Sequence, residues 1–166
     1  MSATKRSELG APTHSKKWYV DVNDGTEEAP DWVPVNGINN FRQVVSPITK
    51  DNSSYASEGW GSNVVTKLNW SLEFKAWRNV DPADAEAYDD GQEILRAAAD
   101  VLGITGRRQV RWYEMEEDGP RVEAYDGWVS VEWKPDGGSD EDIESVTVTL
   151  QGQGKRNAIT HPEPNS

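Results

Sequence analysis

The chain has 166 residues, of which 35% are apolar and 28% charged, and it contains no cysteine. This length suits one hydrophobic core and is short for two. The formal net charge of -12 argues against binding to the phosphate backbone of DNA as the main activity, and the lack of cysteine excludes a disulfide framework, a thiolate zinc site and a cysteine nucleophile.

The charge is unevenly distributed along the chain. Residues 1–17 are polar and carry four basic residues against one acidic residue, Glu8. We interpret them as a basic N-terminal arm that is flexible until assembly, followed by one β-rich domain over residues 18–152 and a C-terminal tail over residues 153–166. A basic arm on an acidic body favours association between copies. No apolar leader and no run of eighteen apolar residues occurs, so we expect neither a secretory precursor nor a membrane protein.

Apolar and polar residues alternate in several runs between residues 18 and 150, which predicts half-buried strands. The clearest run, Val64 to Trp77, places its large apolar residues on one face. Its other face is polar and consists of Lys67, Asn69, Ser71, Glu73 and Lys75. Further strands are predicted at Trp18–Val22, Trp32–Ile38, Phe41–Val45, Arg108–Met115, Tyr125–Trp133 and Val146–Leu150.

Turn residues such as Asn36-Gly37 and Asp118-Gly119 separate these runs, which favours an antiparallel topology. Two long connections, residues 46–63 and 81–90, are predicted as loops, and loops of this length are usually functional or ordered by a partner.

One segment, near residues 89–102, changes to helical spacing. Asp90 and Glu93 form a candidate capping box at its start, and Gly103 follows its end. The residue pattern therefore predicts a mainly β, largely antiparallel domain with one flanking α-helix.

Residues that could carry catalysis or bind a metal are not grouped in the sequence. His14 and His161 lie in the predicted tails without a second ligand at metal-binding spacing, and we expect both to be exposed. The acidic run from Asp136 to Glu144 could attract calcium, but it lacks the order of an EF-hand and is more typical of a solvated hairpin end. We expect no enzyme activity, no catalytic residue, no metal and no cofactor.

The eight tryptophans have two competing explanations. Trp18, Trp70 and Trp133 fit the apolar faces of their strands, which predicts a place in the core. Trp60, within Glu58-Gly59-Trp60-Gly61, and Trp128, on a polar strand face, fit less well. Exposed aromatic residues of this kind are typical of an interface or of a platform for stacking sugars.

A series of short motifs, in this order, resembles the major tail tube proteins of long, non-contractile-tailed phages, particularly those that infect actinobacteria. The resemblance covers roughly residues 18–162. The motifs are Trp32-Val33-Pro34-Val35-Asn36-Gly37-Ile38, Glu58-Gly59-Trp60-Gly61, Leu68-Asn69-Trp70-Ser71-Leu72-Glu73, Asp90-Gly91-Gln92-Glu93-Ile94-Leu95, Val110-Arg111-Trp112-Tyr113, Ala124-Tyr125-Asp126-Gly127 and the stretch from Val146 to Gly154.

The resemblance implies an antiparallel β-sandwich or barrel with one flanking α-helix. It also implies a structural virion protein, assembled in the host cytoplasm, whose hexameric rings stack into a hollow tube for DNA ejection. It implies that the polar face from Lys67 to Lys75 belongs to an inner sheet, and that the loop 46–63 contacts the adjacent ring through Tyr55 and Trp60. The implied partners are other copies of the chain, a tape-measure protein, a tail terminator and distal tail or baseplate proteins, while DNA passes without specific binding. The basic arm residues implied to dock on the next ring are Lys5, Arg6, Lys16 and Lys17.

A second hypothesis comes from a different class of protein. A monomeric β-sandwich could use Trp60, Trp128 and Trp32 to stack on carbohydrate. The two hypotheses differ in their expected behaviour, because a sugar-binding module stays monomeric whereas a tube subunit assembles as its concentration rises.

Overall fold

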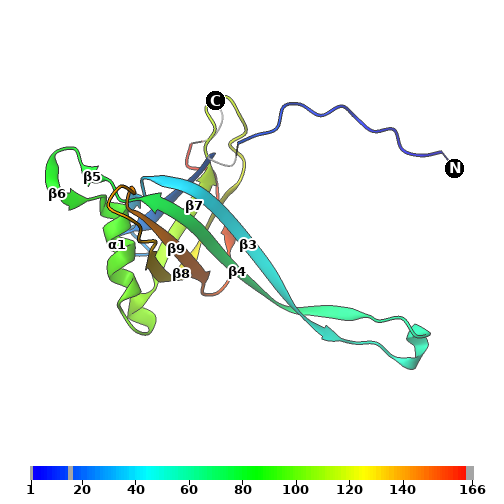
Figure 1. Ribbon diagram of the computed structural model, residues 1–166. Helices are drawn as coiled ribbons and strands as arrows, with labels where there is room; N and C mark the ends of the chain where they lie inside the picture. The colour runs from blue at the N-terminus through cyan, green and yellow to red at the C-terminus, as the bar shows by residue number, and fades with distance from the viewer. Residues whose placement is uncertain (1, 15–16, 164–166) are drawn as a thin grey trace.

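A computed structural model describes residues 2–14 and 17–163 (Figure 1). Its α-helix is α1 (Asp90–Ala99), and short 3-10 turns occur at Tyr55–Ser57 and Ile104–Gly106. The strands are β1 (Trp18–Asn23), β2 (Trp32–Pro34), β3 (Ile38–Asp51), β4 (Asn63–Trp77), β5 (Val80–Asp81), β6 (Asp84–Tyr88), β7 (Arg108–Glu114), β8 (Ala124–Pro135), β9 (Ser145–Gly152) and β10 (Asn157–Ala158).

The main sheet is antiparallel, with the strand order β2-β1-β7-β8-β9-β4-β3, and β10 pairs with β8. The predicted mainly β fold with one helix is therefore confirmed. The predicted strand Trp32–Ile38 differs, because its two ends belong to separate strands, β2 and β3. Gly37 lies between them with a φ of 83°, a conformation that interrupts a strand and that glycine adopts readily.

The sheet curls so that strands near its two ends face each other. Trp18 on β1 stacks on Phe41 of β3, with ring centroids 5.5 Å apart. Trp112 on β7 stacks on Trp70 of β4 at 5.0 Å. These contacts join strands that are not neighbours in the sheet, and the apolar side chains between them form a single core.

Trp70 and Trp112 are buried in this core, whereas Trp18 and Trp133 are partly buried and pack against it. The indole of Trp70 donates a hydrogen bond to the carbonyl oxygen of Gly154. Its ring lies so close to Gly127 and Gly152 that a Cβ atom at either position would overlap it. The interior at this end of the sheet thus accepts only glycine beside the indole.

Helix α1 contacts β1, β2 and β8, and it buries Gln92, Leu95 and Ala98. Its N-cap is Asp89, whose carboxylate accepts a hydrogen bond from the Gln92 N–H, so the predicted start differs by one residue. The helix ends at Ala99, before the predicted end, because Val101 and Leu102 point into solvent and gain nothing from continuing it. Within the described residues, no helix is long and apolar enough to cross a membrane.

The predicted loop 46–63 is too long, because its ends belong to strands. Residues 46–51 continue β3, paired with β4 as far as Asp51 opposite Asn63, and only residues 52–62 turn. Pro47 occurs within this strand, which β3 tolerates because it is the edge strand of the sheet. The predicted loop 81–90 is likewise largely a small hairpin, formed by β5 and β6, followed by the first residue of α1.

The described part of the C-terminal segment returns across the sheet. The Gln153 N–H bonds to the Trp128 carbonyl oxygen, and the Ile159 N–H to that of Ala124. His161 is buried, with Nε2 2.7 Å from the Glu114 carbonyl oxygen and its ring edge-on to Tyr113. The expectation that His161 is exposed is therefore wrong, while His14 is exposed. The sequence shows no signal for this contact, because the tertiary fold brings the partners together.

Candidate self-assembly surfaces

The β3–β4 hairpin projects far beyond the body of the molecule (Figure 1). We define residues 46–68 as the hairpin arm. Every residue of the hairpin arm except the half-buried Ser57 is exposed. Its exposed large apolar side chains are Ile48, Tyr55, Trp60, Val64, Val65 and Leu68. The hairpin arm therefore presents apolar surface that its own chain does not cover.

The tip of the hairpin arm has a defined geometry. Asn52 donates a backbone hydrogen bond to the Ser62 carbonyl oxygen, and Trp60 donates one to that of Ser57. Glu58 has a φ of 53° and Gly59 a φ of 84°, so the chain reverses through two left-handed residues. Tyr55 is fully exposed and the Trp60 side chain is 80% exposed. The tip thus holds two aromatic side chains away from the rest of the chain.

Among residues 2–14 and 17–163, no third strand pairs with the hairpin arm. Outside the body, β3 and β4 pair only with each other, since β9 reaches no further along β4 than Ser71. A two-stranded ribbon is marginally stable alone in water, and its free edges offer unpaired N–H and C=O groups. Apolar exposure and open edges together mark the hairpin arm as a contact surface.

The described N-terminal residues, 2–14, are exposed and lie away from the body (Figure 1). Lys5 and Arg6 lie in this extended part, while Lys16 lies outside the described residues. Lys17 belongs to the body instead, because its ammonium group forms an ion pair with the Glu114 carboxylate at 2.9 Å. The structure thus places Lys17 in an intrachain contact that anchors the start of the domain.

Glu114 is buried at the end of β7, with a side chain only 3% exposed. Burial alone would raise the pKa of its carboxyl group. Hydrogen bonds from Lys17 and from the backbone N–H groups of Glu123 and Val122 outweigh burial and hold the pKa of Glu114 below its usual range. The charged form therefore stabilises the fold.

Replacing Glu114 with glutamine is expected to lower the free energy of unfolding by about 2 kcal/mol at neutral pH, because it removes a buried charged partner of Lys17. Since the folded pKa is depressed, the stability contributed by Glu114 is present above the unfolded pKa and is lost as the pH falls through the folded pKa. Urea unfolding at several pH values should show the difference shrinking below about pH 5. The exposed Glu117→Gln is the control, and a difference that stays constant in acid would contradict the assignment.

From Asn69 to Lys75, the polar face predicted on β4 alternates with buried residues of the core, whereas Lys67 lies in the hairpin arm between exposed neighbours. It continues onto the neighbouring strands, where Ser71 lies opposite Gln151, Glu73 opposite Thr149 and Lys75 opposite Thr147. Ion pairs Arg42–Glu73, at 3.5 Å, and Lys134–Glu132, at 2.9 Å, lie on β3, β4 and β8. This surface therefore carries charges of both signs rather than an excess of acid.

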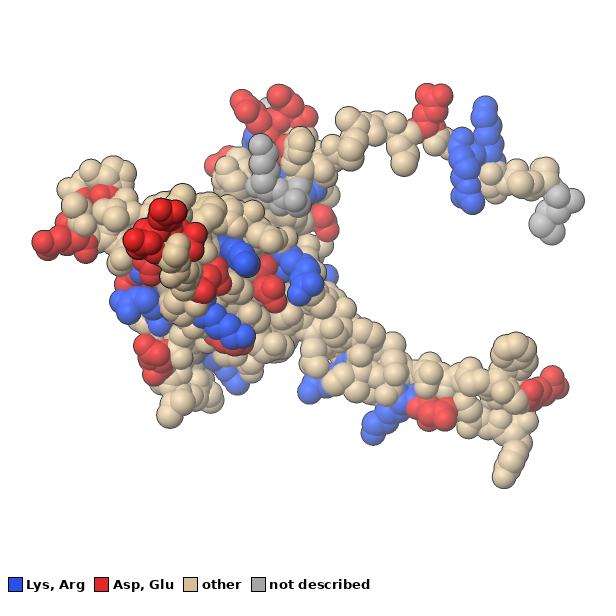
Figure 2. Space-filling model, viewed as in Figure 1, with Lys and Arg blue, Asp and Glu red and all other residues tan. Residues whose placement is uncertain are grey.

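Figure 2 shows charges of both signs crowded on the body and few on the hairpin arm. The long acidic runs lie in the connections between strands at residues 24–31, 116–118 and 136–144, and in the β5–β6 hairpin and the start of α1 at residues 81–90. In the described part of the chain, no group of histidine and acidic side chains is arranged to hold a metal ion.

The three tryptophans proposed for sugar stacking lie in different surroundings. Trp32 and Trp128 are half-buried on the body, and the Arg111 guanidinium lies over the Trp32 ring, 4.7 Å from its centroid. Trp60 is at the tip of the hairpin arm. The structure therefore does not bring the three residues into one platform.

The described residues thus form a curled antiparallel sheet with a flanking helix and a projecting hairpin (Figure 1). No known protein-family model and no curated protein sequence matches the chain. Several solved structures, however, match the chain in fold. The tail of an empty gene transfer agent particle, determined with C6 symmetry, is 13% identical, with a TM-score of 0.59 over 90% of this chain and all of that chain.

Two further solved structures have the same fold. The SPP1 tail tube is 10% identical, with a TM-score of 0.59 over 89% of this chain and 80% of that chain. A chain of the anti-feeding prophage baseplate, determined with six-fold symmetry, is 11% identical, with a TM-score of 0.59 over 93% of this chain and all of that chain. At these identities the likeness is one of fold.

Proposed function

We propose that this protein is the repeating structural subunit of a phage tail tube and that it acts by self-assembly rather than by catalysis. The observation that carries the proposal is the hairpin arm, an exposed apolar ribbon with two free edges on a tail-tube fold. A second copy of the chain supplies the surface that covers it. Tyr55 and Trp60 at the tip are the aromatic anchors of this contact, as aromatic side chains commonly are at interfaces.

The assembly that we propose is a stack of hexameric rings. The six-fold symmetry of the gene transfer agent tail and of the anti-feeding prophage baseplate supports this number. Contacts between different surfaces of identical copies propagate from ring to ring and leave an open-ended tube. The short motifs in the sequence support a long, non-contractile tail of the kind found on phages of actinobacteria.

Within such a tube, the part of the predicted polar face that lies on the body, Asn69, Ser71, Glu73 and Lys75, would line the lumen through which DNA is ejected. The hydroxyl and amide groups on β9 and the paired charges on β3, β4 and β8 support this role. Because Glu73 pairs with Arg42 and Lys134 with Glu132, these charges offer DNA little gain from counterion release. DNA would therefore pass without being held.

The remaining partners follow from the architecture of a tube. An open-ended stack needs proteins at its two ends and a determinant of its length, for which we propose distal tail or baseplate proteins, a terminator and a tape-measure protein. The basic residues Lys5 and Arg6 would dock on acidic connections of the next ring, together with Lys16. The assembled virion is the proposed location, after assembly in the host cytoplasm.

The test is electron microscopy of the purified protein over a concentration series, paired with light scattering. We expect rings or hollow tubes of uniform width to appear as the concentration rises. Addition of preformed tail tips should nucleate tubes at concentrations where the subunit alone stays monomeric. A protein that remains monomeric at every concentration, with and without tips, would contradict the proposal.

A further inference from the structure

A cavity of about 520 Å³ lies at the base of the hairpin arm, where β3 and β4 leave the body. Val45 and Leu68 supply exposed apolar side chains to it, and Trp70 forms part of its wall. The rest of its lining comes from Lys67, Asn69 and residues 152–156 after β9. The cavity therefore combines apolar surface with basic groups from two distant segments of the chain.

The cavity is basic on a strongly acidic chain. Lys67, Lys155 and Arg156 line it, and no carboxylate does. None of the three forms an ion pair with any residue in the described ranges. Arg156 is held in place by the Tyr125 ring, 4.2 Å away, and by a hydrogen bond to Gln43. The guanidinium of Arg156 is thus held in position, and none of the three charges is neutralised by an ion pair within the described residues.

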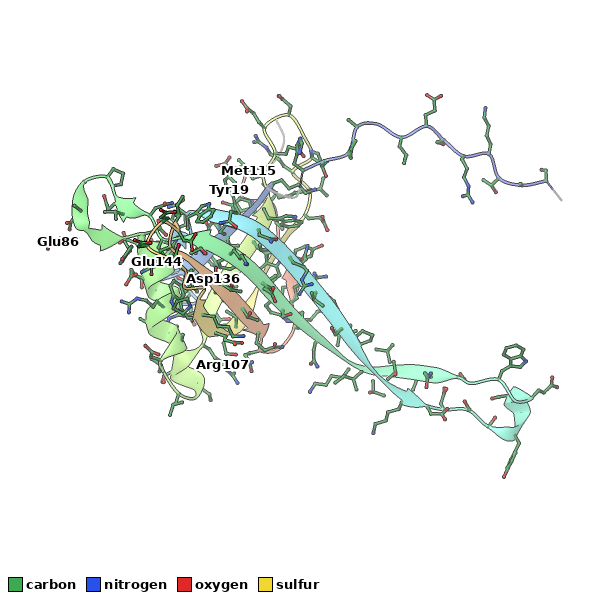
Figure 3. All side chains as sticks on the ribbon, in the orientation of Figure 1. Tyr19, Glu86, Arg107, Met115, Asp136 and Glu144 are labelled. Atoms are coloured by element: carbon green, nitrogen blue, oxygen red, sulfur yellow. The ribbon has the colours of Figure 1, made fainter. Side chains whose placement is uncertain are left out.

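The complementary surface lies at the other end of β9. The connection between β8 and β9, residues 136–144, carries five acidic residues and no basic one. These acidic residues have no ion-pair partner among the described residues. Ile143, within this acidic loop, is 71% exposed. Figure 3 shows Asp136 and Glu144 on the side of the body away from the hairpin arm.

We propose that the cavity at the base of the hairpin arm receives the acidic loop 136–144 of a second copy of the chain. Ile143 would pack on Leu68 and Val45, and the carboxylates beside it would meet Lys67 and Lys155. The inference deepens the proposed self-assembly, because it names a second contact in addition to the tip of the hairpin arm.

The two surfaces cannot meet within one chain. The loop precedes β9 at Ser145 and the cavity follows it at Gly152, so they are separated by the length of the strand, roughly 25 Å. A contact between opposite ends of identical molecules is heterologous and repeats from copy to copy. It also offsets the repulsion between copies that each carry a net charge of -12, because it places unpaired positive groups against unpaired negative ones.

Cysteine cross-linking tests the contact directly, because the chain has no cysteine of its own. Full-length Leu68→Cys and Ile143→Cys proteins are mixed and treated with a short bismaleimide. We expect the cross-linked dimer to form in this mixture about ten times faster than in a control mixture of Leu68→Cys with Leu102→Cys. In the control, the second cysteine replaces a leucine after α1 that is 92% exposed. A rate equal to the control would overturn the proposal.

Charge exchange gives the second test. Lys67→Glu/Lys155→Glu in the Leu68→Cys protein should reduce cross-linking about tenfold, and Asp140→Lys/Glu141→Lys in the Ile143→Cys partner should restore it. Lys75→Glu/Lys134→Glu, on the polar face and outside the cavity, makes the same change in net charge and is the matched control, which should leave cross-linking unchanged. Reduction without restoration would show that the cavity binds some other anion and would overturn the proposal.

These readouts separate the two proposals. The same cross-link is measured in proteins that also carry Trp60→Ala, below the concentration at which tubes form. Cross-linking without tubes under any condition would support the cavity contact and contradict the tube. Tubes whose subunits do not cross-link between positions 68 and 143 would support the tube and overturn the cavity contact.

Discussion

Replacing Trp60 with alanine is expected to leave the fold of the isolated subunit intact and to raise the concentration needed for assembly about thirtyfold, which corresponds to about 2 kcal/mol per contact. The physical reason is the position of the side chain. It is 80% exposed at the tip of the hairpin arm, so the monomer loses little buried surface when it is removed. In an assembly, the Trp60→Ala variant would lose the apolar contact that the indole makes with a neighbouring copy.

Sedimentation of tubes over a concentration series measures the assembly threshold, and urea unfolding of the monomer measures the fold. Leu102→Ala is the matched control, because Leu102 is a large apolar residue that is 92% exposed on the body rather than on the hairpin arm. We expect this control to assemble at the wild-type concentration. Unfolding of the Trp60→Ala monomer, or assembly at the wild-type threshold, would remove Trp60 from the interface.

Replacing Trp112 with alanine should have the opposite consequence, a loss of about 4 kcal/mol of unfolding free energy in the monomer. Trp112 is fully buried. Its ring stacks on Trp70 at 5.0 Å and lies 5.8 Å from that of Tyr125, and its N–H group donates to the Gln43 side chain at 3.2 Å. Alanine would leave a large cavity at the point where β7 faces β3 and β4. A domain of this size has only about 5–15 kcal/mol of stability in total.

Urea unfolding followed by near-ultraviolet circular dichroism measures this effect, since the dichroism reports the packing of aromatic rings. Trp112→Phe is the graded variant and should lose less, because it keeps an aromatic ring but not the hydrogen bond to Gln43. Trp60→Ala serves as the control for removal of a tryptophan as such. A loss below about 1 kcal/mol for Trp112→Ala would contradict a central place in the core.

The strands were predictable wherever one face of the sheet is buried. Alternation in β4 identifies Trp70, Leu72 and Phe74 as one face because each packs into the core. The same logic failed in residues 46–51, where both faces of β3 are exposed and no apolar alternation is required. Residues 46–63 were therefore predicted as a loop, although Trp60 within them was singled out as a poor fit for the core and is 80% exposed.

Other features could not be found from local pattern. The burial of His161 depends on Glu114 and Tyr113, which are 47 and 48 positions away along the chain. The sequence pattern assigned Lys17 to a basic arm, yet its ammonium group forms an ion pair with Glu114 in the body. The basic cavity is assembled from residues 67–70 and 152–156, so neither segment alone carries its signal.

The sequence by itself determined the fold class, the helix and the polar face of β4, because periodicity follows directly from which side of each element is buried. Only the tertiary structure decided which tryptophans are core and which project, where the acidic loop lies relative to the basic cavity, and that the β3–β4 hairpin extends beyond the body. Those properties depend on how distant segments meet as the sheet curls. The contacts of β3 with β1 and with β7 determine these properties, and no local pattern of residues encodes those contacts.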